Sequence, residues 1–146
     1  MKSLTNFITE ETKLPERKVF LGGTCADTTW REELIEDLMV EYFNPVVDDW
    51  TEDCIKIEND EKENKCNIHL YVITKEMEGA YSIAEAVESV HNKDKKTIFW
   101  VISNGFEKHQ LKSFQAICEL IKKHGGKAVL QNNMNGLAKV INNVEV

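Results

Sequence analysis

The sequence has few residues that interrupt regular structure, with only 2 Pro and 7 Gly among 146 residues. This scarcity excludes collagen-like and low-complexity chains. With 42% hydrophobic and 29% charged residues, the composition is that of a globular protein. The length is that of about one domain. We expect residues 17–146 to form a single domain after a short polar N-terminal extension at residues 1–16.

An excess of positive charge is also missing, because 25 acidic residues outnumber 18 basic ones and give a net charge of −7. Proteins that bind nucleic acid polymers or anionic membrane surfaces present basic faces, so we expect neither partner. Residues 48–63 hold eight acidic and only two basic residues, and most of the excess charge therefore lies there. Such a run is typical of a solvated helix face.

Clustered cysteines and long apolar runs are absent as well. The four cysteines form no CxxC pair and no Cys/His cluster with zinc spacing, so we expect no metal site. Scattered single cysteines suit a reducing cytosol. The first residues lack the apolar core of a signal peptide, and no run approaches the ~18 apolar residues of a membrane span. These observations predict a cytoplasmic protein.

Short apolar runs alternate along the chain with longer amphipathic stretches. The apolar runs predict strands at residues 18–21, 42–47, 67–74, 96–103 and 127–130. The stretches between them predict helices, the first capped by Asp27 or Thr28 and the others at residues 54–65 (helix or loop), 82–91, 109–124 and 136–143. This alternation is typical of an α/β fold in which helices cover both faces of a parallel sheet. We expect a three-layer sandwich with five parallel strands in the order 2-1-3-4-5.

In such a sheet, ligands bind beyond the carboxyl ends of the strands where the strand order reverses. The segment after the first strand holds Gly22 and Gly23, followed by Thr24. Paired glycines either let a ligand approach free backbone N–H groups or form a simple strand-to-helix turn. The pattern is neither GxGxxG nor a Walker loop, so the known nucleotide-phosphate motifs are absent.

The segment after the second strand carries Asp48, Asp49 and Trp50. Two carboxylates beside an indole could bind the edge of a planar ligand while the ring covers its face. The same residues could equally form an acidic turn with a half-buried Trp.

The segment after the third strand contains Ser82 and Glu85, which have the spacing of a helix capping box. Glu85 lies off the apolar helix stripe of Ile83 and Val87 and close to the helix N-terminus, which favours its ionised form. An ionised carboxylate is the form that attacks as a nucleophile. A capping role and a catalytic role both remain open at this point. The nearby His69 is better explained as a hydrogen-bonded core or edge histidine than as a catalyst.

Four motifs follow one another along the chain: Phe20–Thr24, Trp30–Leu34, Asn44–Trp50 and Ser82–Glu85. Together they resemble the nucleoside 2-deoxyribosyltransferase-like family. Each motif alone is weakly specific, whereas their order and intervals over roughly residues 18–103 are distinctive. The resemblance implies a flavodoxin-like fold and cleavage of the N-glycosidic bond of a 2′-deoxynucleoside, with transfer of deoxyribose to another nucleobase.

The resemblance also assigns roles to residues. Glu85 corresponds to the family's nucleophile, which forms a covalent glutamyl-deoxyribose intermediate, and Asp48 or Asp49 would protonate or orient the leaving base. The other expected substrate-binding residues are Gly22, Gly23, Thr24, Asn44, Trp50, Gly79 and Ser82. The expected partners are a small-molecule nucleoside and a nucleobase, and relatives suggest a homo-oligomer. The chemistry requires no metal and no organic cofactor.

Two other functions remain open. If water replaces the second base, the protein is a nucleoside or nucleotide N-glycosidase, a hydrolase. A non-catalytic nucleoside or nucleotide sensor on the same fold is the other alternative. Asn67, at the start of the third strand where relatives often have an acid, and the short acidic segment after Trp50 would suit that sensor. The acidic rim of the expected pocket favours an uncharged nucleoside over a phosphate-bearing ligand.

Overall fold

The computed structural model describes residues 16–25, 27–47, 49 and 51–146. Apart from Glu16, the predicted N-terminal extension lies outside these residues. The strands are β1 (Lys18–Gly23), β2 (Glu41–Phe43), β3 (Ile68–Ile73), β4 (Lys96–Ile102) and β5 (Lys127–Gln131). The helices are α2 (Trp30–Asp37), α3 (Glu52–Asp60), α4 (Tyr81–Val90), α5 (Lys108–Lys123) and α6 (Leu137–Asn142). A short π-helix, η1 (Glu61–Lys65), continues α3.

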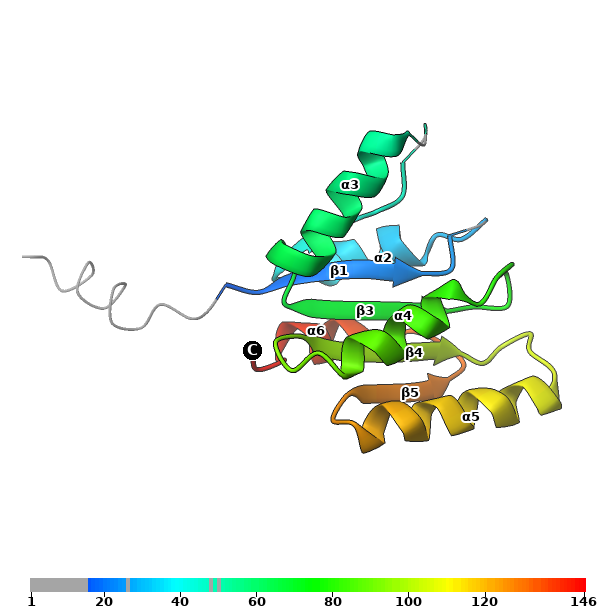
Figure 1. Ribbon diagram of the computed structural model, residues 1–146. Coiled ribbons are helices and arrows are strands. Elements are labelled where there is room, and N and C mark those ends of the chain that lie inside the picture. Colours follow the sequence, from blue (N-terminus) through cyan, green and yellow to red (C-terminus); the bar gives the residue numbers. More distant parts are fainter. Residues whose placement is uncertain (1–15, 26, 48, 50) are drawn as a thin grey trace, which may run out of the picture.

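The five strands form one parallel sheet in the order β2-β1-β3-β4-β5. Helices α4 and α5 pack on one face of the sheet, and α2 and α6 pack on the other (Figure 1). The predicted α/β flavodoxin-like fold is therefore confirmed. The strand order reverses between β1 and β3, so the crevice expected for a ligand lies at the carboxyl ends of these two strands.

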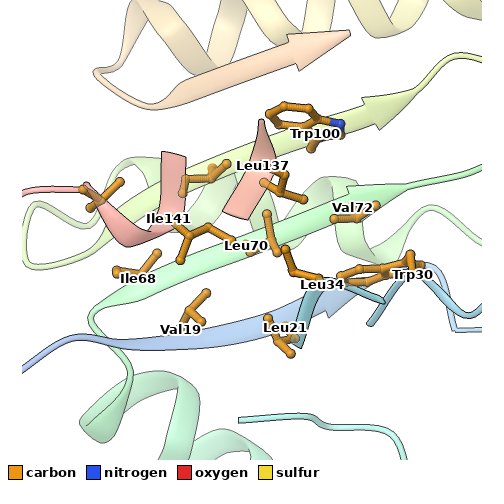
Figure 2. Close-up of a cluster of buried hydrophobic side chains, with 12 residues drawn as sticks. Val19, Leu21, Trp30, Leu34, Ile68, Leu70, Val72, Trp100, Leu137 and Ile141 are labelled. Carbon is orange, nitrogen blue, oxygen red and sulfur yellow. The ribbon is translucent and has the colours of Figure 1, made fainter. Parts of the chain in front are cut away.

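The core has two parts because side chains along each strand alternate between the faces of the sheet. Val19, Leu21 and Leu70 face α2 and α6, where they meet Leu34 and Leu137 (Figure 2). The intervening residues of the same strands, with Phe20 and Tyr71 among them, face α4 and α5. Strands β3 and β4 are buried on both faces, which explains why their sequences are almost continuously apolar.

Two local predictions differ from the structure. The second strand ends at Phe43, well before residue 47, and it lies at the sheet edge as Pro45 indicated. The predicted capping of α2 by Asp27 or Thr28 is wrong, because the N-cap is Thr29 and no side chain caps the helix. The Thr28 hydroxyl instead lies 3.3 Å from the Cys25 carbonyl oxygen, and Asp27 has a left-handed φ of +46°.

The helices differ in how deeply they pack. Helix α5 buries Phe114, Cys118 and Ile121 against the sheet. Helix α3 buries no residue, and its Ile55 and Ile57 are 44% and 56% exposed. Among the described residues, no helix is both long enough and apolar enough to cross a bilayer.

Candidate functional site

Strand β1 ends in two glycines that no larger residue could replace, and with Thr24 they form a turn called the glycine loop below. Gly23 has a φ of +117°, and a Cβ atom on it would lie 2.0 Å from the Val72 carbonyl oxygen. A Cβ atom on Gly22 would lie 2.7 Å from the ring of Tyr71. The two glycines therefore let β1 pack closely beside β3 at the reversal point, and this packing accounts for them without any ligand.

Thr24 joins the ends of the two central strands. Its backbone N–H donates to the Val72 carbonyl at 2.9 Å, and its hydroxyl oxygen accepts the Thr74 N–H at 3.0 Å. Thr24 is buried, and its own carbonyl accepts hydrogen bonds from Trp30 Nε1 at 2.9 Å and Arg31 Nη1 at 2.8 Å. Thr24 thus fixes the shape of the crevice floor.

Arg31 is a site residue to which the sequence reasoning assigned no role. Its guanidinium is buried and donates to the carbonyls of Leu21, Gly23 and Thr24 at 2.9, 3.2 and 2.8 Å. It also lies 4.3 Å from the centre of the Trp30 ring, within cation–π distance. Burial lowers the pKa of Arg31 from its ordinary value, although such a group stays charged at neutral pH. Arg31 therefore holds the glycine loop through three carbonyls at once.

A first cavity of about 220 Å³ lies between this loop and the segment after β3. It brings together four of the predicted substrate-binding residues: Gly23, Thr24, Gly79 and Ser82. Its other lining residues are Cys25, Ile73, Met77, Glu78 and Tyr81. Among the described residues of that lining, Glu78 alone is charged. Gly79 has open space around it, since a Cβ atom there would meet no heavy atom within 4 Å.

Glu85 does not form the predicted capping box. Helix α4 begins at Tyr81 with Ala80 as its N-cap, and no side chain caps it. Ser82 is therefore already inside the helix, and Glu85 lies in the second turn instead of the first. The Glu85 carboxylate accepts a hydrogen bond from Lys62 on η1, with Nζ and Oε2 2.8 Å apart. The two side chains are only 13% and 15% exposed, so this is a largely buried ion pair.

Glu85 and Lys62 line a second cavity of about 220 Å³ between η1 and α4. The buried residues of its lining include His69, Tyr71 and Ser89. Tyr81 lines both cavities, and its side chain is 75% exposed. Glu85, the predicted nucleophile, therefore lines the second cavity, and the glycine loop lines the first. Tyr81 belongs to the lining of both cavities.

The charges around Glu85 shift the pKa values of its neighbours. Burial alone would lower the pKa of Lys62, but the hydrogen bond and negative charge of Glu85 outweigh it and the pKa is raised. Burial raises the pKa of Glu58 on α3, and the charge of Glu85 raises it further. Burial, followed by the charge of Glu85, also raises the pKa of Tyr71 and keeps its phenol protonated. Lys62 is thus the cation that offsets a concentration of acidic groups.

His69 is a hydrogen-bonded core histidine, as predicted. Its Nδ1 lies 2.9 Å from Ser89 Oγ, and its Nε2 lies 2.7 Å from the Lys62 carbonyl oxygen. Burial lowers its pKa to about 4, so the ring is neutral at physiological pH. Asn67 lies at the opposite end of β3 from the crevice, where its side-chain oxygen accepts the Lys18 N–H. Asn67 therefore does not bear on the site.

Of the residues predicted to act after β2, the structure describes only Asn44 and Asp49. Asp48 and Trp50 lie outside the described residues. Asp49 is exposed, and its carbonyl accepts a hydrogen bond from Cys54 Sγ at 3.6 Å. The Asn44 side-chain oxygen accepts the Val46 N–H at 3.0 Å and so forms a local turn. Neither Asn44 nor Asp49 lines the cavities described above. No group of three or more metal-ligating side chains gathers anywhere in the part of the chain that is described.

Comparison with known proteins identifies a family. The sequence model of the family described as "Nucleoside 2-deoxyribosyltransferase like" matches residues 16–104, more than half of the chain. The matched region includes β1, Arg31, Lys62 and Glu85, and it ends just after β4. The search of curated proteins finds no match.

Proposed function

The chain belongs to the nucleoside 2-deoxyribosyltransferase-like family, and on this premise we propose that it moves deoxyribose from one nucleobase to another. The observation that carries the proposal is the largely buried Glu85 carboxylate on α4, which pairs with Lys62 at 2.8 Å in a cavity over the central strands of the sheet. An ionised carboxylate in a crevice of this kind is the nucleophile that a retaining glycosyl transfer needs.

The proposed reaction has two displacements. First, a Glu85 oxygen bonds to C1′ of the 2′-deoxynucleoside, and the bonding electrons of the C1′–N bond leave with the base, which takes up a proton. Second, a nitrogen of the incoming base attacks C1′ from the opposite side, the C1′–O bond breaks, and its electrons return to the carboxylate. The incoming base loses its N–H proton in this step. These bond changes are complete without a metal or an organic cofactor.

The remaining residues have supporting roles in this proposal. In this proposal the substrate spans the two cavities that share Tyr81: part of it lies against Gly23, Thr24, Gly79 and Ser82 in the first cavity, and C1′ faces Glu85 in the second. Asp48 or Asp49 supplies or orients the proton for the leaving base, because a neutral base leaves more readily than an anion. Asn44 and Trp50, from the same segment, complete the base side.

The charges near the first cavity favour a substrate without a phosphate group. Among the described residues that line it, only Glu78 is charged, and it is an acid. Arg31, beneath the glycine loop, binds backbone carbonyls; Lys62 and Lys95, which line the second cavity, bind Glu85 and two backbone carbonyls. We therefore propose an uncharged nucleoside as substrate rather than a nucleotide.

Incubation with 2′-deoxynucleosides, with and without a second free base, tests the function. Chromatography is expected to show a new nucleoside only when the acceptor base is present. Glu85→Gln, which keeps the side-chain size and removes the charge, is expected to abolish turnover while leaving thermal unfolding near that of the wild type. Glu119→Gln, at an exposed position of α5, is the matched control.

The other outcomes of this experiment are equally specific. Release of base without a new nucleoside would identify a hydrolase. A ligand-induced rise in melting temperature without any base release would identify a sensor. Normal turnover by Glu85→Gln would remove Glu85 from the mechanism. A homo-oligomer stays a prediction, to be checked by sedimentation, and exposed Ile55 and Ile57 on α3 are apolar surface available for it.

A further inference from the structure

The π-helix η1 positions Lys62 beside Glu85. The wider turn is closed by the Cys66 N–H, which donates to the Glu61 carbonyl at 2.7 Å. Its first residue, Glu61, is nearly buried and pairs with Lys18 at 2.8 Å. Lys62 is the next residue, and its side chain points toward α4. A π-turn between helix and strand is a local departure from regular geometry of the kind often found at functional sites.

A buried chain of hydrogen bonds fixes the backbone of Lys62. A carbonyl oxygen can only accept, so the contact of 2.7 Å requires His69 Nε2 to carry the proton and donate to Lys62. His69 Nδ1 then accepts from the Ser89 hydroxyl at 2.9 Å, and Ser89 accepts from Thr97 at 2.7 Å. Thr97, Ser89 and His69 are all buried. The chain therefore has one direction, from Thr97 on β4 to the Lys62 carbonyl.

Helix α4 consequently holds Lys62 at two points. Ser89 lies four residues after Glu85, so the two side chains are one turn apart on the same helix face. Ser89 holds the Lys62 carbonyl through His69, and Glu85 binds the Lys62 ammonium directly at 2.8 Å. A surface ion pair loses side-chain entropy when it forms, whereas here the Lys62 backbone is already held by His69 and both side chains are largely buried.

We infer that Lys62 is a positioning residue of the reaction: it holds Oε2 of Glu85, leaves Oε1 free to attack C1′, and stabilises the carboxylate when the sugar leaves. This inference rests on the proposed function and adds a residue to it. In the first displacement the bond forms at Oε1, and Oε2 becomes the ester carbonyl oxygen. In the second displacement the C1′–Oε1 electrons return to the carboxylate, and the ammonium beside Oε2 offsets the negative charge.

Lys62 affects the rates of the two displacements in opposite directions. A cation beside a carboxylate makes it a weaker nucleophile but a better leaving group, because both effects come from stabilising its negative charge. Loss of Lys62 should therefore slow the second displacement more than the first. The glycosyl-enzyme ester would then accumulate, which a merely structural lysine would not cause.

The test compares Lys62→Met with Lys65→Met. Lys65 lies on the same π-helix, but its side chain is 55% exposed and contacts Asp60 and Glu61 instead of Glu85. Turnover of Lys62→Met is expected to fall about 10–100-fold, the usual effect of losing a charge-assisted hydrogen bond. A burst of the first base, equal to the amount of enzyme, should precede slow turnover. Intact mass spectrometry should detect the deoxyribosyl adduct on Glu85.

Further variants make the result decisive. Lys62→Arg retains the positive charge and is expected to restore most of the turnover and remove the adduct. Lys62→Gln, which donates a hydrogen bond without a charge, repeats the test if the Met variant folds poorly. Turnover of Lys62→Met equal to that of Lys65→Met would overturn the role of Lys62, as would slow turnover without burst or adduct. An inactive wild-type protein would instead overturn the proposed function, and this role with it.

Discussion

The hydroxyl oxygen of Thr24, just beyond β1, accepts the backbone N–H of Thr74, just beyond β3, at 3.0 Å. Both residues are buried, with exposed fractions of 6% and 7%. This bond connects the two strand ends between which the sheet order reverses. The walls of the crevice are therefore joined by a side chain as well as by the sheet.

Thr24→Val is expected to destabilise the protein by about 1–3 kcal/mol, because the nearly isosteric side chain leaves the buried Thr74 N–H without a partner. Urea unfolding followed by circular dichroism measures the loss. Thr24→Ser keeps the hydroxyl and should therefore lose clearly less stability than Thr24→Val. Equal stabilities of the Val and Ser variants would show that the hydroxyl contributes nothing.

Gly23→Ala is expected to prevent folding, or to lower the free energy of unfolding by well over the ~1–3 kcal/mol that left-handed backbone strain alone would cost. The excess comes from the collision of the new Cβ atom with the Val72 carbonyl oxygen at 2.0 Å. Gly136→Ala separates the two effects, because Gly136 also has a positive φ, of +90°, but a Cβ atom there meets no neighbour within 4 Å. Similar melting temperatures for the two variants would contradict the packing argument.

Arg31→Lys is expected to lower kcat/KM by about 10–100-fold, because small displacements of a site loop have effects of this size. One ammonium cannot reproduce the planar fork with which Arg31 reaches the carbonyls of Leu21, Gly23 and Thr24. Kinetics of base release would measure the effect, with circular dichroism as the check on folding. Wild-type kinetics in the lysine variant would mean that the loop keeps its shape without the guanidinium.

His69 is expected to make the protein less stable as the pH falls from about 6.5 to about 4. Burial lowers its pKa to about 4 in the folded protein, whereas the unfolded chain takes up the proton near the ordinary value of about 6.5. Between these values the unfolded state binds more protons, so unfolding is favoured by on the order of 2–3 kcal/mol at the low end. Above pH 6.5 this contribution is absent.

Urea unfolding of His69→Gln at several pH values checks this dependence. The variant should lose less stability over the window than His109→Gln, in which an exposed histidine is replaced. Parallel pH profiles for the two variants would contradict a neutral, buried His69.

The fold could be predicted because its signals are local. The unbroken apolar runs of β3 and β4 are those of strands buried on both faces, and Pro45 marks an edge strand. The crevice followed from strand order, and the first cavity lies there with Gly23 and Thr24 in its lining, whereas Glu85 lines the second cavity between η1 and α4. The capping box was wrong because α4 begins one residue earlier than Ser82, and because a lysine charge binds Glu85 more strongly than a backbone N–H would.

The partners of the site residues could not be predicted, for a physical reason. Lys62 and Glu85 are 23 residues apart and meet only because a π-turn and a helix pack on the same side of β3. Arg31 sits in a recognisable motif, but its three acceptors are backbone carbonyls, which carry no sequence signal. Contacts of this kind depend on tertiary packing rather than on local pattern.

The open space around Gly79 has a practical consequence for redesign of the protein. Gly23 and Arg31 make close contacts with backbone atoms. Substitutions of these residues are therefore expected to destabilise the fold before they alter substrate selectivity. Gly79 borders the same cavity, yet a Cβ atom added there would meet no heavy atom of another described residue within 4 Å. Small substitutions such as Gly79→Ala and Gly79→Ser are therefore expected to change the size and polarity of the cavity while leaving the scaffold intact.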